Sequence, residues 1–224
     1  ILASSFTTND VESVSYTAGS TNEIVYIHAD MWTTSGSNTY DMEIGFLAPE
    51  TSLMISEVLY DASSSDGGKE WVELYNGTHS PIDLSSYSIG GGGNDYTNSQ
   101  LQLAGTIPPG GCWVVGGPTS SADNAFPVFE LAQEILSNLQ NSNSAGVADG
   151  VALFDVPAVA VTAATVPYDT VVYGTTNPNG LMDSTGAPSA VDVVDVSGGN
   201  SILRRGGAWE QEGSPSPNDC SHAW

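Results

Sequence analysis

Apolar and polar residues alternate in short runs along much of the chain, and the clearest runs lie in its first half. Leu53–Tyr60 and Lys69–Asn76 are rich in β-branched and aromatic residues. Ser, Asp and Gly fill most of the stretch 61–68 between them. This order predicts a strand, a loop and a second strand. We expect the rest of the chain to pack around this pair.

Shorter runs of similar composition predict further strands downstream of this pair. They lie at 100–103, 112–115, 150–155, 169–173 and 201–204. Gly90–Gly93 predicts a turn, and Pro108–Gly111 predicts another, because its Pro-Pro-Gly-Gly sequence interrupts both helix and ladder. The Ala- and Val-rich segment 157–166 fits either a loop or an edge strand.

One segment departs from this pattern of strands. In Glu130–Gln140 the apolar residues recur at helical spacing, at Leu131, Ile135, Leu136 and Leu139. We therefore predict one short helix here, carried by an insertion that covers about 118–148.

Residues 1–48 are predicted to form a separate small β unit. Its expected strands are Val11–Tyr16, Glu23–Ala29 and Tyr40–Phe46. With Tyr40, Met42 and Ile44 in its last strand, the unit resembles the last half of a bacterial pre-peptidase C-terminal domain. So few strands leave an edge and an apolar face uncovered. We expect the second domain, an upstream fragment or a neighbouring copy to cover them.

A linker at 49–52 is predicted to join this unit to a second domain at 53–224. The sequence shows no signal-peptide pattern and begins at Ile1 inside ordinary folded sequence, so we expect a mature or trimmed product. It has no apolar run long enough to span a bilayer, and we expect no insertion into a membrane.

The charge balance is strongly acidic. The 224 residues include 26 Asp and Glu against 3 Lys and Arg, which gives a formal net charge of −23 at pH 7. Phosphate recognition needs clustered Lys or Arg, so we expect no nucleic-acid partner. An acidic surface repels its own copies and attracts cations, and calcium or a salty medium relieves that repulsion.

The loop between the first two predicted strands is the best candidate for a cation site. Asp61, Asp66 and Glu70 supply carboxylate oxygens around a flexible Gly-Gly turn. Calcium prefers about six to eight hard oxygen ligands, and the loop lacks the spacing of an EF-hand. Calcium is therefore a candidate cofactor at these three residues, and an acidic, solvated loop is the alternative.

Patterns that indicate catalysis are sparse. None of the 3 His residues is accompanied by a Gly-x-Ser-x-Gly motif, which leaves a hydrolytic triad without support. Glu57 and Glu73 lie mid-strand in the first pair of strands, as a glycosidase pair would require. Alternatively, Glu73 lies on the solvent face or accepts backbone hydrogen bonds. We favour this alternative and expect no enzymatic activity.

Cys112 and Cys220 are the only two cysteines and lie too far apart for a CxxC redox pair or a zinc ribbon. If they pair, they close a loop of about 110 residues and stabilise the fold by roughly 4–5 kcal/mol in the chain-entropy model. Two free buried thiols are the alternative. A long-range bridge and the low Lys content indicate an oxidising, extracellular setting.

Several motifs between Leu53 and Cys220 occur together in a characteristic order. They lie at 54–60, 69–76, 82–85, 107–111, 150–154, 201–204 with Trp209, and 214–218. In order and spacing they closely resemble the bacterial lamin-tail domain family. The resemblance implies an all-β, immunoglobulin-like β-sandwich, with which the predicted strands and turns agree. It also implies paired cysteines of the kind found in secreted proteins, and it carries over no catalytic residues.

The resemblance further implies an extracellular or cell-surface bacterial module. We expect a non-catalytic structural or adhesion module that associates with its own copies, or with other cell-surface proteins, and builds a fibre or surface layer through exposed strand edges. The alternative is a C-terminal targeting or substrate-binding fragment of a secreted protease or nuclease. Carbohydrate binding by such a fragment would use surface aromatics such as Tyr87, Tyr96 and Trp32.

Overall fold

The computed structural model describes residues 52–117, 119, 131–134, 139–141 and 146–221. The chain divides into two compact units, Ile1–Leu47 and Ala48–Trp224. The first unit lies outside the described residues, so its strands and its resemblance to a pre-peptidase C-terminal domain stay predictions. Everything below concerns the second unit.

Within the described residues, six strands form the larger of two facing sheets, here called the large sheet. Their order across the sheet is β12-β11-β1-β2-β7-β8. Their bounds are β1 Leu53–Leu59, β2 Trp71–Asn76, β7 Cys112–Gly116, β8 Leu131–Glu134, β11 Ser201–Arg205 and β12 Ala208–Glu212. Neighbouring strands are antiparallel, except that β7 and β8 run parallel.

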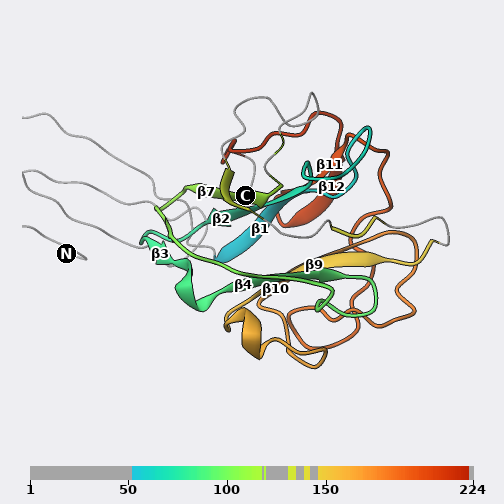
Figure 1. Cartoon of the computed structure of the whole chain (residues 1–224), viewed down its shortest axis with the longest axis horizontal. Coiled ribbons are helices and arrows are strands. Elements are labelled where there is room, and N and C mark those ends of the chain that lie inside the picture. The colour runs from blue at the N-terminus through green and yellow to red at the C-terminus, as the bar shows by residue number, and fades with distance from the viewer. Residues whose placement is uncertain (1–51, 118, 120–130, 135–138, 142–145, 222–224) are drawn as a thin grey trace, which may run out of the picture. The chain divides into compact units, whose positions relative to one another are not determined.

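The second sheet, here called the small sheet, has four described strands in the order β10-β9-β4-β5, all antiparallel. Their bounds are β4 Ser88–Gly92, β5 Ser99–Gln102, β9 Asp149–Phe154 and β10 Asp169–Tyr173. A short pair, β3 (Ile82–Asp83) and β6 (Thr106–Ile107), stands apart from both. Figure 1 shows the two sheets as two layers, which confirms the predicted immunoglobulin-like β-sandwich.

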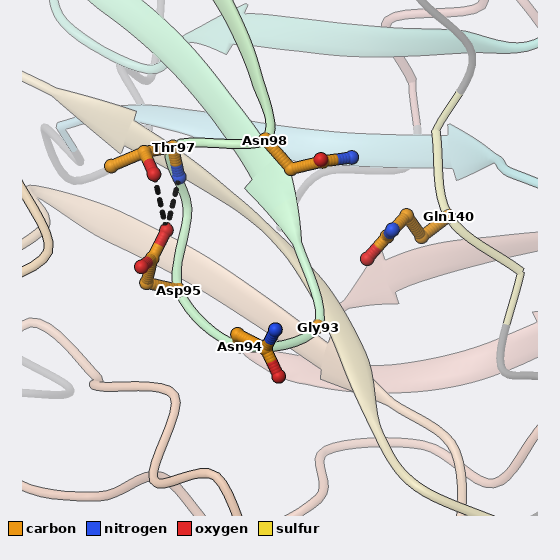
Figure 2. A pocket seen from close by; sticks show the side chains of 6 residues that line it. All are labelled: Gly93, Asn94, Asp95, Thr97, Asn98 and Gln140. Carbon is orange, nitrogen blue, oxygen red and sulfur yellow. Dashed lines mark hydrogen bonds between the residues drawn. The ribbon is translucent and has the colours of Figure 1, made fainter.

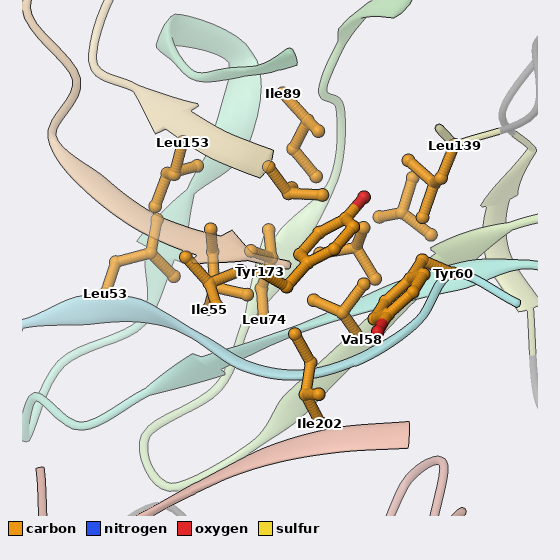
Figure 3. Packing of buried hydrophobic residues seen from close by; sticks show 14 of the residues in the cluster. Leu53, Ile55, Val58, Tyr60, Leu74, Ile89, Leu139, Leu153, Tyr173 and Ile202 are labelled. Atoms are coloured by element: carbon orange, nitrogen blue, oxygen red, sulfur yellow. The ribbon is translucent and has the colours of Figure 1, made fainter. Parts of the chain in front are cut away.

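The core lies between the two sheets and follows from the alternation of side chains along each strand. In β2, Val72 and Leu74 belong to the main apolar cluster, whereas Glu73 between them points the opposite way. Figure 3 shows the side chains that fill this space, among them Tyr60 and Tyr173. Their rings stack with centroids 3.8 Å apart, so an aromatic contact joins the segment after β1 to β10 in the other layer.

An irregularity in β1 decides which of its residues reach the core. The pairing with β2 shifts between Ile55 and Glu57, so Ser56 is an extra residue and forms a β-bulge. The bulge reverses the alternation, and Ile55 and Val58 both belong to the core. It also places Glu57 directly opposite Glu73. Both glutamates therefore lie on the side of the large sheet that faces away from the small sheet, here called the outer face.

The helix predicted for Glu130–Gln140 is wrong in its described part. Leu131–Glu134 forms β8, which pairs with β7, and residues 139–141 have no regular structure. Residues 135–138 lie outside the described part. The edge of β7 offers hydrogen-bond partners to the backbone of this segment, and apolar spacing over so short a run does not separate helix from strand.

The turn predicted for Gly90–Gly93 is also wrong, because Gly90–Gly92 form the end of β4 between β5 and β9. The reason is steric. A Cβ on Gly90 would lie 2.2 Å from the carbonyl oxygen of Tyr96, which folds back against the strand. Glycine in this strand therefore allows a close approach of two backbones.

Candidate functional site

The carboxylate pair Glu57 and Glu73 is the most chemically distinctive feature of the described residues. The two side chains lie opposite each other on β1 and β2, and their exposed fractions are 0% and 1%. The expectation that Glu73 might lie on a solvent face is therefore wrong. Two buried acids of like charge need hydrogen-bond donors around them, because burial removes their hydration.

The donors come largely from the segment that follows β12, here called the C-terminal segment, Ser214–Ser221. Ser216 donates to Glu57 twice, from its backbone N–H at 3.0 Å and from its hydroxyl at 2.8 Å. The backbone N–H of Asn218 donates to Glu73 at 2.6 Å. Asn218 is the one non-glycine residue of the described part with positive φ, at 67°. Asn tolerates this left-handed conformation better than most residues do.

Two serines within the large sheet supply further donors. The hydroxyl of Ser201 in β11 donates to Glu57 at 2.5 Å, and that of Ser56 donates to Glu73 at 2.8 Å. Glu73 thus accepts a backbone hydrogen bond, as the favoured interpretation predicted. The carboxylates are engaged by the protein's own groups and hold the end of the chain against the outer face.

A disulfide joins Cys112 to Cys220 and fixes the same segment covalently. It links the first residue of β7 to the C-terminal segment, with the two Cα atoms 5.5 Å apart. Met54 and Tyr75 are buried beside it on the outer face. The pairing implied by the family resemblance is therefore formed, and it closes a loop of 108 residues in sequence.

The electrostatics of the pair reflect its burial. Burial raises the pKa of Glu73 to about 8, and the neighbouring Glu57 adds to the rise, while hydrogen bonds from Ser56 and Asn218 oppose it. Glu73 is consequently protonated in the folded chain over much of the range where a free glutamate is charged. A glycosidase pair needs carboxylates that reach a substrate, and these two are buried beneath the chain's own end.

The three predicted calcium ligands lie near one another, and each is hydrogen-bonded to the described end of the insertion, residues 139–141. The amide of Asn141 donates to Asp66 at 3.1 Å and to Asp61 at 3.4 Å. The backbone N–H of Leu139 donates to Glu70 at 2.6 Å. The acids therefore fasten the insertion to the loop between β1 and β2.

Glu70 is the most buried of the three, with 4% of its surface exposed and its Oε1 without a hydrogen-bond partner. Burial raises its pKa to about 8, and the charges of Asp66 and Asp61 contribute. Across the part of the chain that the structure describes, no three His, Cys, Asp or Glu side chains are grouped to hold a metal ion. Calcium at Asp61, Asp66 and Glu70 stays a prediction.

A polar pocket opens at one end of the small sheet (Figure 2), with a volume of about 340 Å³. Its described lining residues are Gly93, Asn94, Asp95, Thr97, Asn98 and Gln140. Asp95 accepts hydrogen bonds from the backbone N–H and the hydroxyl of Thr97, at 2.8 and 2.5 Å, so its carboxylate shapes the turn. Asn98 and Gln140 extend into the space between their two segments.

The aromatics considered for carbohydrate stacking do not line this pocket. Tyr96 is only 3% exposed, and its hydroxyl donates to the carbonyl oxygen of Met182. Tyr87 is half-buried against the core. The interpretation of Tyr96 as a surface aromatic is therefore wrong, because a loop residue next to glycines packs into the space that they leave. Trp32 lies outside the described residues.

The sequence did not identify the groups that satisfy the buried acids. Ser201, Ser216 and Asn218 are about 140 to 160 positions away from the glutamates that they contact. A signal for them existed, since two glutamates at mid-strand and a Ser-Pro-Ser-Pro-Asn sequence after the last strand are both part of the family pattern. Joining the two required the bulge at Ser56, which no local pattern marks.

A β-sandwich whose buried acids bind its own end belongs to the immunoglobulin-like class of modules. Within that class, the chain belongs to the Lamin Tail Domain family, whose model matches residues 48–175. The match includes both core sheets up to β10, while β11, β12 and the C-terminal segment lie beyond it. No curated protein and no solved structure was found to match the chain. In its described part, no helix has the length and apolar character needed to cross a membrane.

Proposed function

We propose that this protein is a non-catalytic structural or adhesion module of the bacterial exterior, secreted or held at the cell surface. The observation that carries the proposal is the buried pair Glu57 and Glu73, which is engaged by the chain's own Ser216 and Asn218. The groups best suited to acid–base chemistry thus serve to close the fold. Membership of the Lamin Tail Domain family, an immunoglobulin-like family, is compatible with this role.

The disulfide supports an extracellular setting. Disulfides persist in oxidising compartments and are rare in the reducing cytosol. Cys112 and Cys220 use both cysteines of the chain in a bridge between a buried strand and the C-terminal segment. A reduced environment would remove the covalent part of this closure.

The proposed partners are further copies of the chain or other cell-surface proteins. With a net charge of −23, copies repel one another at low ionic strength. Association therefore needs salt or bound cations to screen the charge, or an apolar contact that outweighs the repulsion. Calcium at Asp61, Asp66 and Glu70 would lower the negative charge of one such surface.

Analytical ultracentrifugation of the purified, oxidised chain tests the proposal. We expect the average mass to rise with protein concentration, and the rise to be larger at 500 mM than at 50 mM NaCl, about ten-fold lower salt. A parallel series with calcium chloride, matched in ionic strength, separates specific binding from screening. A strictly monomeric chain in every condition would contradict self-association.

A further inference from the structure

The connection between β9 and β10 is a long loop that is both uncharged and ordered. Residues 156–168, here called the apolar loop, contain no Asp, Glu, Lys or Arg, although 26 of the 224 residues are acidic. The sequence left this stretch as a loop or an edge strand, and it is a loop with one 3-10 turn, η2, at Ala158–Ala160. Long loops in compact domains are usually functional.

The apolar loop exposes large apolar side chains. Val159 is 98% exposed, Val166 46% and Tyr168 36%. Val194 is the only other large apolar residue exposed in the described part of the chain. Exposed apolar side chains scattered singly are ordinary, but a group of them on one segment marks an interaction site.

Hydrogen bonds within the loop fix its conformation. The N–H groups of Ala160 and Val161 donate to the carbonyl oxygens of Pro157 and Ala158, at 2.8 and 3.1 Å. The N–H of Thr165 donates in the same way to the carbonyl of Thr162, at 3.0 Å. These turns present Val159 at the tip of η2.

Contacts with the small sheet anchor the loop at both ends. The hydroxyl of Ser88 donates to the carbonyl of Val156 at 2.7 Å, and the side chain of Gln102 accepts from the N–H of Ala158 at 2.9 Å. At the far end, the N–H of Tyr168 donates to the carbonyl of Leu153 at 2.7 Å. A loop that is already ordered loses little conformational entropy when a partner binds it.

The charge of the chain indicates which partner fits this surface. A basic partner would be drawn to the acidic surface and would gain nothing from a stretch without charge. An acidic partner is repelled everywhere except where charge is absent. A second copy of this chain is such a partner, and a contact of loop against loop keeps both contacting surfaces free of charge.

We propose that the apolar loop is the surface through which two copies of the chain associate, each loop packing on the other. The inference rests on the proposed self-association and names its contact surface. The contact is isologous, because the same residues lie on both sides of it. Salt strengthens it, since screening weakens the repulsion between the two acidic bodies while the apolar contact remains.

Two matched charge variants test the proposal by sedimentation equilibrium of the full, oxidised chain at several salt concentrations. Val159→Asp adds one charge at the tip of the loop, and Val194→Asp adds the same charge at an exposed valine outside it. We expect V159D to weaken dimerisation by about ten-fold or more, and V194D by about two-fold or less. Circular dichroism checks that both variants fold as the wild type does.

Three results would overturn the inference. If V159D and V194D weaken association equally, the loop is not the contact, although self-association itself stands. If association of the wild type weakens as salt rises, an electrostatic contact replaces the apolar one. If the wild type remains monomeric at all concentrations, the inference fails together with the proposed self-association.

Discussion

On the outer face of the large sheet two carboxylates are fully buried, while on the apolar loop three large apolar side chains are exposed. Each arrangement is the reverse of what the polarity of its residues suggests. Glu57 and Glu73 are buried because the C-terminal segment lies on them and supplies donors. Val159 is exposed because nothing in the described chain lies on it. Burial therefore depends on what covers a surface, and an apolar surface without a cover indicates a missing partner.

The largest expected effect comes from removing the covalent part of the cover. Replacing both Cys112 and Cys220 by Ser should lower the free energy of unfolding by about 4 kcal/mol, because the unfolded chain regains the entropy of a long closed loop. Chemical denaturation measures the change. Reducing agent should lower the stability of the wild type and leave the double variant unchanged. Equal sensitivity of the two proteins would contradict the role of the bridge.

Removing a buried acceptor should have the next largest effect. Glu57→Ala leaves the donors of Ser201 and Ser216 without an acceptor and should cost about 3 kcal/mol of unfolding free energy. Glu210→Ala is the matched control, since Glu210 pairs with Arg205 on the exposed edge strand β12. Its loss should cost no more than about 0.5 kcal/mol. Similar losses in both variants would show that the buried pair is not special.

Stability should also fall as pH rises from about 5 to 7. The pKa of Glu73 is raised in the folded chain to about 8 from an ordinary 4.5, so the folded state binds more protons than the unfolded state between these values. The stabilisation is complete below about 4.5 and is lost as pH rises through the folded value, with a change on the order of 2 kcal/mol between pH 5 and 7.

Glu73→Gln isolates this contribution from the other acids with raised pKa, Glu70 and Asp149. The amide does not titrate, so the variant should lose less stability over the same pH range than the wild type does. Denaturation midpoints at matched ionic strength provide the comparison. Parallel pH profiles would show that Glu73 does not titrate as described.

The smallest expected effect separates two valines of the apolar loop. Val161 is 8% exposed and belongs to the small apolar cluster beside β9, whereas Val159 is 98% exposed. Val161→Ala should cost about 1 kcal/mol through lost packing. Val159→Ala should change the stability of the monomer by less than about 0.5 kcal/mol. Thermal unfolding of dilute protein checks both, and an equal loss would mean that Val159 is packed within its own chain.

Much of the sandwich was predictable because its strands obey local rules. The alternation in Lys69–Asn76 separates Val72 and Leu74 from Glu73, and β2 has this arrangement. The burial of Glu73 was not predictable in the same way, because its partner Asn218 is 145 residues away. Local alternation assigns a side chain to a face, and only tertiary contacts decide whether that face is wet.

The errors share a physical origin. Leu131–Glu134 follows the hydrogen-bonding groups at the edge of β7, which its own apolar spacing does not reveal. Gly90–Gly92 continues β4 because the carbonyl of Tyr96 approaches too closely for any side chain. Asp61, Asp66 and Glu70 looked like ligands for a cation, and the structure shows Leu139 and Asn141 as their donors. In each case a distant segment determines the local outcome.

The position of the C-terminal segment in the sequence has a consequence for synthesis. Ser216 and Asn218 follow every described strand, so they leave the ribosome after β1 and β2 have been made. Until then, the nascent chain carries two glutamates that lack their backbone donors, and its outer face stays hydrated. Closure of that face, and the thiol oxidation that accompanies it, are therefore late events in the maturation of the protein.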